Sequence, residues 1–239
     1  MRHLLFVVLV TLVSAGTACA ANPVFTDNFN GSAVNLNNWN THFRWGDVII
    51  NNELQAYTPN NFKVSGGTIK IQARIEHAIY GDQLMQYTSG VLTSYYQRIY
   101  GKWVIRCKMP SAGKGFWPAF WLYPAESGTS QTIIPAEWFG AFPTTMTTLY
   151  AEQNGATHYQ YPQGNYAGQW HIYAVEWRPN FVSITIDGIE VNRYDGPTQA
   201  VPMYMILNFA VASQDPVGPP DGLTVFPADF EIDYIKVYP

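Results

Sequence analysis

Residues 69–76 read Ile-Lys-Ile-Gln-Ala-Arg-Ile-Glu, an unbroken alternation of apolar and polar side chains. The same period of two recurs at 102–109, where Trp, Ile, Cys and Met occupy the odd-numbered positions. Successive side chains of a β-strand point to opposite faces, so this period indicates strands that are buried on one face. Convincing helical periodicity is absent outside the first twenty residues. The pattern predicts an antiparallel, all-β domain.

Turn signals divide the chain into many short strands. Segments 181–186 and 189–194 flank Asp187-Gly188, the dipeptide that favours a type I′ hairpin because both central residues need positive φ. Further strands are expected at 170–177 and 230–238. The 19 Gly and 16 Pro punctuate the chain at short intervals without a linker-like tract or an internal repeat. Many short strands separated by turns predict a two-sheet sandwich or a barrel.

Residues 1–20 have the pattern of an export signal. They begin with basic residues, continue through a mostly apolar stretch and end in small residues up to Ala20. The apolar stretch is too short to span a bilayer, and no later segment is apolar for about eighteen residues. We therefore expect a secreted or extracytoplasmic protein with one domain over 21–239. Cleavage after Ala20 is favoured over lipid attachment at Cys19, since Gly16 stands where a lipoprotein signal carries an aliphatic residue.

The composition narrows the classes of partner. A net charge of −4 and only 13% charged residues exclude nucleic-acid binding, which needs clustered Lys and Arg. The 8 Trp and 16 Tyr suit a packed core, but they also suit a cleft that stacks on sugar rings. Without the export signal Cys107 has no second cysteine for a disulfide, and the His residues show no metal-binding spacing. We expect a monomer that requires no cofactor.

The clearest functional motif spans two neighbouring strands. Residues 116–124 read Phe-Trp-Pro-Ala-Phe-Trp-Leu-Tyr-Pro, and Glu137 follows Pro124 by thirteen residues within Pro-Ala-Glu-Trp-Phe-Gly. This pair resembles the active-site strands of glycoside hydrolase family 16, the laminarinase-like β-glucanases. Other segments resemble the family in the same order, namely 25–31, 38–40, 51–58, 100–121, 173–177, 187–188, 206–211 and 225–238. The resemblance implies a β-jelly roll with a concave glycan-binding sheet and hydrolysis of β-glucan.

The catalytic motif of that family is incomplete in this chain. The family carries Glu-x-Asp-x-x-Glu, and the ungapped register places its three acids on Thr132, Ile134 and Glu137. Residues i and i+2 of a strand share a face, and a bulge lets residue i+5 rejoin it. This register implies that Glu137 is the acid/base and that the nucleophile is absent. A gapped alternative makes Glu137 the nucleophile, but it deletes about four residues from a central strand and breaks the pairing register.

Glu152 is the candidate for a replacement carboxylate. If the chain turns back near residue 142, antiparallel pairing sets Glu137 opposite Thr147 and Thr132 opposite Glu152. Directly paired residues share a sheet face, so Glu152 would lie beside the position of the missing nucleophile. The alternative is a solvent-facing Glu at a strand end. Two functions therefore stay open: a β-glucan hydrolase, and a non-hydrolytic β-glucan-binding protein on the same scaffold.

Substrate contacts are expected from three segments. Trp117 and Trp121 lie four positions apart on one strand face. There they either form the floor of sugar-binding subsites or pack into the core. The resemblance assigns the cleft's polar contacts to the segment that contains Asn52, Glu53 and Gln55. A third contact is Asn208, since an amide flanked by apolar residues needs hydrogen-bond partners.

The resemblance also implies a structural calcium site formed by acids near the first and last strands. Asp233 is present, but Asn28 stands in place of the acid expected after Asp27. We therefore expect no required metal.

Overall fold

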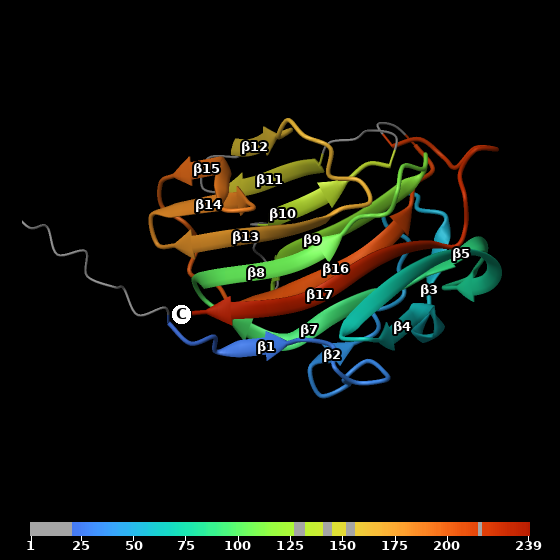
Figure 1. The fold of residues 1–239 in the computed structure, drawn as a ribbon, viewed down its shortest axis with the longest axis horizontal. Helices are drawn as coiled ribbons and strands as arrows, with labels where there is room; N and C mark the ends of the chain where they lie inside the picture. The colour runs from blue at the N-terminus through green and yellow to red at the C-terminus, as the bar shows by residue number, and fades with distance from the viewer. Residues whose placement is uncertain (1–20, 127–131, 141–144, 152–155, 215–216) are drawn as a thin grey trace, which may run out of the picture.

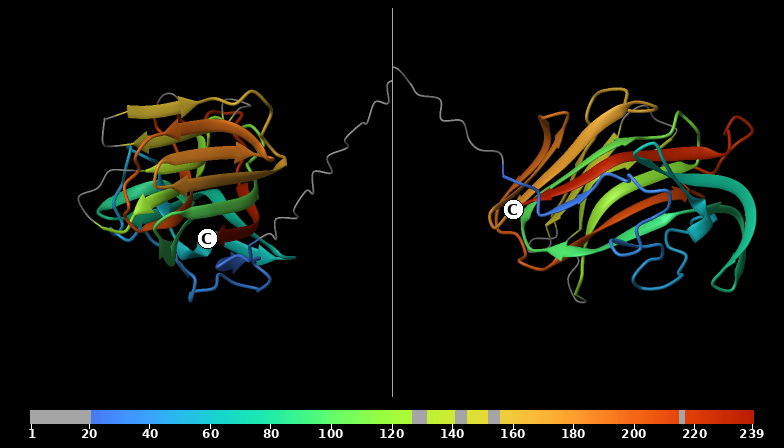
Figure 2. Two further views of the ribbon diagram at one scale, coloured as in Figure 1. Left: turned by 90° about the vertical axis from the view of Figure 1, so that its left-hand side faces the viewer. Right: turned by 60° about the horizontal axis from the view of Figure 1, so that its bottom comes forward.

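The computed structural model describes residues 21–126, 132–140, 145–151, 156–214 and 217–239. They form two stacked, curved sheets (Figures 1 and 2), which is the predicted sandwich. The first sheet contains, in spatial order, β15 (Ile189–Asp195), β14 (Phe181–Ile186), β13 (Trp170–Arg178), β8 (Gly101–Lys108), β17 (Ala228–Tyr238), β5 (Thr68–Tyr80), β6 (Gln83–Ser89) and β3 (Gln55–Tyr57), with β1 (Phe25–Asp27) on β17 and β4 (Phe62–Ser65) on β5.

The second sheet carries the functional motif. Its order is β12 (Ala156–Gln160), β11 (Thr145–Ala151), β10 (Ile133–Trp138), β9 (Phe116–Pro124), β16 (Met203–Val211), β7 (Val91–Arg98) and β2 (Trp39–Asn40). A short 3₁₀ turn, η1 (Pro59–Asn61), leads into β4. Pairing is antiparallel as predicted, apart from β3, which lies parallel to β6. No helix in the described ranges has the length and apolar character that a bilayer crossing requires.

The core lies between the sheets. Trp103, Ile105 and Cys107 of β8 are fully buried and alternate with half-exposed residues, as the period of two predicts. Trp39, Trp138 and other large rings fill the space from the opposite sheet. The predicted hairpin is also confirmed: Asp187 and Gly188 have φ of 51° and 82°, and β14 pairs with β15 on either side of them.

One expectation for the core is wrong. The alternation at 69–76 predicts that Ile75 is buried with Ile69, but Ile75 is 69% exposed whereas Ile69 is fully buried. The pairing of β5 with β6 shifts register between Ile75 and Ala78. Beyond this point the β5–β6 hairpin, teal in Figure 2, curls around one end of the molecule. The alternation of residues within one strand does not show where that strand extends beyond the opposite sheet.

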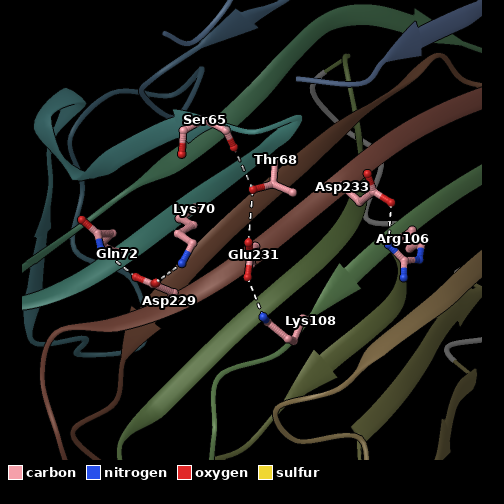
Figure 3. A network of polar contacts seen from close by, with 9 residues as sticks. All are labelled: Ser65, Thr68, Lys70, Gln72, Arg106, Lys108, Asp229, Glu231 and Asp233. Carbon is pink, nitrogen blue, oxygen red and sulfur yellow. Dashed lines mark hydrogen bonds and ion pairs between the residues drawn. The ribbon is translucent and has the colours of Figure 1, made fainter. Parts of the chain in front are cut away.

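The outer face of the first sheet carries a ladder of ion pairs (Figure 3). Three acids of β17 alternate with buried residues, and each faces a base on a neighbouring strand: Asp229 to Lys70 at 2.9 Å, Glu231 to Lys108 at 2.6 Å and Asp233 to Arg106 at 2.6 Å. Most of these side chains are about a third exposed, so each pair contributes less than about 1 kcal/mol. The ion pairs match opposite charges on neighbouring strands, and they contribute little to the free energy of unfolding.

Asp233, which the resemblance assigns to calcium, and Asp27, which precedes Asn28, are engaged by protein groups. Asp233 pairs with Arg106, and Asp27 accepts hydrogen bonds from the Phe29 amide and the side chains of Asn38 and Trp39. In the described ranges no three His, Cys, Asp or Glu side chains gather as a metal site would require. These residues do not fit a calcium site. That the protein requires no cofactor stays a prediction, as does the export signal in residues 1–20, which lie outside the described ranges.

Candidate active site

A cavity of about 570 Å³ opens on the outer face of the second sheet. The strands β10, β9 and β16 lie side by side there (Figure 1), and the segment before β3 forms a wall. The inward residues of these strands pack in the core, so the alternate positions line the cavity. The lining consists of Ile50, Asn51, Glu53, Trp117, Ala119, Trp121, Thr132, Ile134, Glu137, Phe139, Tyr159, Tyr161 and Asn208.

A bulge in β10 brings the three motif positions together. Simple alternation would put Ala136 on the same face as Thr132 and Ile134. The register of β10 shifts between Ile134 and Glu137 against β11, and between Ile133 and Ala136 against β9. As a result Glu137 lines the cavity with Thr132 and Ile134, while Ala136 is in the core. This is the arrangement that the ungapped register predicts, with a carboxylate at the third position alone.

Glu137 is buried at the base of the cavity. Its carboxylate Oε1 accepts a hydrogen bond of 2.7 Å from Nε1 of Trp117, and only 7% of the residue is exposed. Burial raises the pKa of Glu137 to about 7; the Trp117 hydrogen bond lowers that pKa, and the charge of Glu53 raises it. A carboxyl group with this pKa holds its proton near neutral pH, so Glu137 can donate a proton to a bound substrate.

Glu53 is the second buried carboxylate of the cavity and is 5% exposed. Its Oε2 accepts hydrogen bonds from Nε2 of Gln55 at 2.7 Å and from the hydroxyl of Tyr57 at 3.2 Å, and its Oε1 accepts one from Nδ2 of Asn51 at 3.2 Å. Burial raises the pKa of Glu53 to about 6, and the three hydrogen bonds lower it.

A hydrogen-bonded chain connects Glu53 to the floor of the cavity. Tyr57, which donates to Glu53, accepts a 3.0 Å bond from Nδ2 of Asn208, and Oδ1 of Asn208 accepts a 2.9 Å bond from Nε1 of Trp121. Gln55 Oε1 accepts from the backbone amide of Val211 at 2.6 Å. The strands β3, β9 and β16 are thus tied together by side chains that leave little rotational freedom to Glu53.

Most sequence-predicted contacts converge on the cavity. Trp117, Trp121, Glu53 and Asn208 line it together with Glu137. Gln55 does not; it is buried behind Glu53 and positions that carboxylate.

Asn52 is exposed in a turn with φ of 52° and is not part of the cavity lining, so its role as a substrate contact stays a prediction.

Sequence reasoning missed Asn51, Tyr57, Tyr159 and Tyr161. Tyr57 had a signal, because it belongs to the same segment 51–58 whose Glu53 and Gln55 the resemblance assigns to the cleft. The tyrosines of the β12 region had none, since nothing local says that this edge of the sheet folds over the cavity.

Glu152 lies outside the described residues, and the hairpin register that supported it is wrong. Glu137 pairs with Met146 rather than Thr147, and Ile133 pairs with Leu149. Continued by one residue, this register sets Thr132 opposite position 150 and not Glu152. The hairpin is centred earlier than residue 142, and the bulge takes up a further residue.

Comparison with known proteins gives the same fold and family. The model of glycosyl hydrolases family 16 matches residues 51–217. The chain is 28% identical to endo-1,3-1,4-beta-glycanase EglC of Rhizobium meliloti (90% of this chain, 51% of the relative) and 27% identical to glucan endo-1,3-beta-glucosidase A1 of Niallia circulans (91% and 38%). It thus spans about half of the first relative's length and less than half of the second's. The catalytic domain of an endo-1,3-beta-glucanase (laminarinase) from Thermotoga petrophila superposes with a TM-score of 0.80 at 28% identity, covering 92% of this chain and 98% of that one. The fold is the jelly roll of these neighbours, and the chain belongs to glycoside hydrolase family 16.

Proposed function

We propose that this protein hydrolyses β-1,3-glucan with Glu137 as the proton donor. The observation that carries the proposal is the position of Glu137: it is buried in the cavity, held by Trp117, and its pKa is raised to about 7. Cleavage of a glycosidic bond needs a carboxylic acid that protonates the leaving oxygen. The relatives named above, which are endo-glucanases, support a polysaccharide substrate.

The cavity lining suits a glucan chain. Trp117, Trp121 and Tyr161 present rings to the same space, and ring faces contact the axial C–H groups of glucose units. Asn51 and Asn208 supply amides that hydrogen-bond to hydroxyls. Tyr161 is 55% exposed, which leaves much of its ring surface for a ligand. This mixture of rings and amides favours a neutral sugar polymer over a charged ligand.

One observation favours a second function, binding without hydrolysis. Thr132 and Ile134 line the cavity at the positions where the family pattern places two acids. Neither side chain can attack an anomeric carbon as a carboxylate does. A protein with these residues and no substitute nucleophile would hold the glucan through the same rings and amides.

We also propose that the protein acts outside the cytoplasm as a monomer. The support for export is the signal pattern of residues 1–20, and the support for a monomer is the burial of Cys107, which keeps its thiol from an intermolecular disulfide. Fractionation of producing cells and sedimentation of the exported protein test the two statements separately.

The function is tested by incubating the purified protein with soluble β-1,3-glucan. Reducing ends are measured over time, and binding is measured by retardation in a gel that contains the polymer. We expect both signals, with Glu137→Gln losing hydrolysis and keeping retardation. The control Glu190→Gln alters an exposed carboxylate on β15 and should match the wild type. Retardation without reducing ends would establish the binding function instead, and neither signal would rule out both.

A further inference from the structure

A second cavity, of about 260 Å³, lies between the segment that follows β12 and the β14–β15 hairpin. We call it the edge cavity. Its lining consists of Pro162, Gln163, Tyr166, Ile186, Asp187, Ile189 and Val191, and none of these seven residues belongs to the lining around Glu137.

The cavity around Glu137 extends across the strands to the edge of the second sheet. Its lining includes Asn208 of β16, Trp117 of β9 and Glu137 of β10, and it also includes Tyr159 of β12. The strand β12 is the last in the order of this sheet (Figure 1). Tyr161, which follows β12 directly, lines the same cavity. A polymer that lies along this cavity would therefore leave the sheet over β12.

The two cavities adjoin at this edge. Tyr161 lines the cavity around Glu137, whereas the next two residues, Pro162 and Gln163, line the edge cavity. Consecutive Cα atoms are only about 3.8 Å apart. The strand β12 also contacts β15, where Nδ2 of Asn192 donates to the backbone carbonyl of His158 at 3.1 Å. A chain that passes over β12 thus reaches the hairpin that forms the edge cavity.

The polar groups of the edge cavity are held in place. Oδ2 of Asp187 lies 2.6 Å from Nδ1 of His171, and Oδ1 accepts a 2.8 Å bond from the backbone amide of Ile172. Tyr166 packs edge-to-face on the same imidazole, and its hydroxyl donates to the backbone carbonyl of Gln163 at 3.2 Å. The Asp187 side chain is nevertheless 46% exposed, so it remains accessible to a ligand. Such pre-organisation lowers the entropy that binding must remove.

These groups suit a neutral sugar. The ring of Tyr166 offers an apolar face to sugar C–H groups. The carboxylate of Asp187 accepts hydrogen bonds from hydroxyls, and the amide of Gln163 both donates and accepts them. A carboxylate repels an anionic ligand, so phosphates and acidic polysaccharides are disfavoured. The rest of the lining is apolar and consists of Pro162, Ile186, Ile189 and Val191.

We propose that the edge cavity is a second glucan-binding site, which holds the same polymer chain after it has passed Tyr161. The inference rests on the proposed function, since that function supplies the glucan. A chain bound at two sites dissociates more slowly than a chain bound at one, because rebinding at the second site is intramolecular. The edge cavity therefore favours long polymers over short oligosaccharides and takes no part in the chemistry at Glu137.

Ile189→Arg tests the proposal by filling the edge cavity. Ile189 is 71% exposed, so the substitution leaves the core intact, and the new guanidinium can pair with Asp187. The matched control is Ile79→Arg, which adds the same charge at a residue that is 70% exposed and belongs to neither lining. In a gel that contains β-1,3-glucan polymer, we expect Ile189→Arg to raise the apparent Kd at least about fivefold and Ile79→Arg to match the wild type. Equal retardation of the two variants, with melting temperatures that show both to be folded, would overturn the proposal.

Substrate length separates this inference from the proposed function. Reducing ends are measured from the polymer and from a β-1,3-linked trisaccharide. We expect Ile189→Arg to raise the KM for the polymer about fivefold more than the KM for the trisaccharide. An equal change for both substrates would refute the edge cavity and leave hydrolysis standing. If the wild type releases no reducing ends, hydrolysis fails, but the gel comparison still decides on the edge cavity. A wild type that is also not retarded would refute both.

The imidazole of His171 reports on the edge cavity without any change to its lining. His171 contacts both Asp187 and Tyr166, so a ligand held by these residues should shift its ring-proton signals in NMR spectra. The measurement uses Glu137→Gln, in which the glucan stays intact, and β-1,3-glucan oligosaccharides of increasing length. We expect the His171 signals to move only with oligosaccharides long enough to pass Tyr161. Signals that stay fixed at every length would overturn the proposal.

Discussion

The indole Nε1 of Trp117 lies 2.7 Å from Oε1 of Glu137, across the β9–β10 pair. The contact joins Trp117, which we propose as a sugar platform, to Glu137, the proposed acid, so the proposed binding and proton-transfer roles meet at one hydrogen bond. Its electrostatic effect opposes that of burial, because an N–H donor stabilises the charged carboxylate. The acidity of Glu137 is therefore set by a balance that a single substitution can move.

Replacing Trp117 by Phe should shift the pH dependence of activity upward. The ring stays apolar but no longer donates to Glu137, so the pKa of this carboxyl group rises further. The alkaline limb of kcat/KM, which reports the acid in the free enzyme, should move to higher pH. Trp121→Phe is the matched control, since its indole bonds to Asn208 and not to Glu137. An unmoved limb in Trp117→Phe, or an equal shift in both variants, would contradict the assignment.

Glu137→Gln should stabilise the protein selectively at high pH. The pKa of Glu137 is about 7 in the folded state against 4.5 for a free Glu, so the folded state holds a proton that the unfolded state releases. The stabilising effect of that proton is present below the unfolded pKa and is lost as pH rises through about 7. The shift corresponds to a loss on the order of 3 kcal/mol for a buried group.

Urea unfolding at about pH 5 and pH 8 measures this difference. The free energy of unfolding of the wild type minus that of Glu137→Gln should be smaller at the higher pH than at the lower pH. The same difference at both values would show that Glu137 titrates as an exposed carboxylate does.

Restoring the two missing acids should raise the rate of hydrolysis. The bulge already presents positions 132 and 134 to the cavity, so Thr132→Glu with Ile134→Asp needs no change of backbone. We expect faster hydrolysis of β-1,3-glucan and, by NMR, a first product with the β-configuration, because a carboxylate near Glu137 permits the retaining route. Thr132→Gln with Ile134→Asn controls for size without charge. A folded double variant that gains nothing would argue against the ungapped register.

Tyr161→Ala should weaken binding of the polymer by about tenfold, that is by about 1.4 kcal/mol, with little effect on stability. The ring lines the cavity and is largely exposed, so its removal deletes ligand contact and little core packing. Tyr95, which is 56% exposed and is not part of the lining, provides the control Tyr95→Ala. Gel retardation measures both. Equal behaviour of the two variants would place the glucan elsewhere on the surface.

Local sequence patterns predict those parts of the structure that depend on interactions between residues close in sequence. The Asp187-Gly188 hairpin and the alternation of β8 follow from backbone preference and strand geometry, and both are observed. The exposure of Ile75 depends on where β5 leaves the opposite sheet, which no window of sequence contains.

The site divides in the same way. Trp117, Trp121 and Glu137 share one motif, and the bulge that the motif spacing implies brings Glu137 to the face of the two Trp residues. The contact between Glu53 and Asn208 through Tyr57 joins residues about 150 positions apart and depends on sheet order. The register between β10 and β11 includes the residue that this bulge adds, whereas the Glu152 prediction was built on an unbulged hairpin.

Cys107 lies at the centre of the core on β8, fully buried between the sheets, and burial raises the pKa of its thiol. A thiol reagent reaches it only when the sandwich opens, so the labelling rate measures the population of opened molecules. Among the described residues it is the single free cysteine, and labelling there gives an unambiguous mass increment. The protein thus contains its own probe of opening, far from the cavity, with which the folding of each variant can be followed in the presence of glucan.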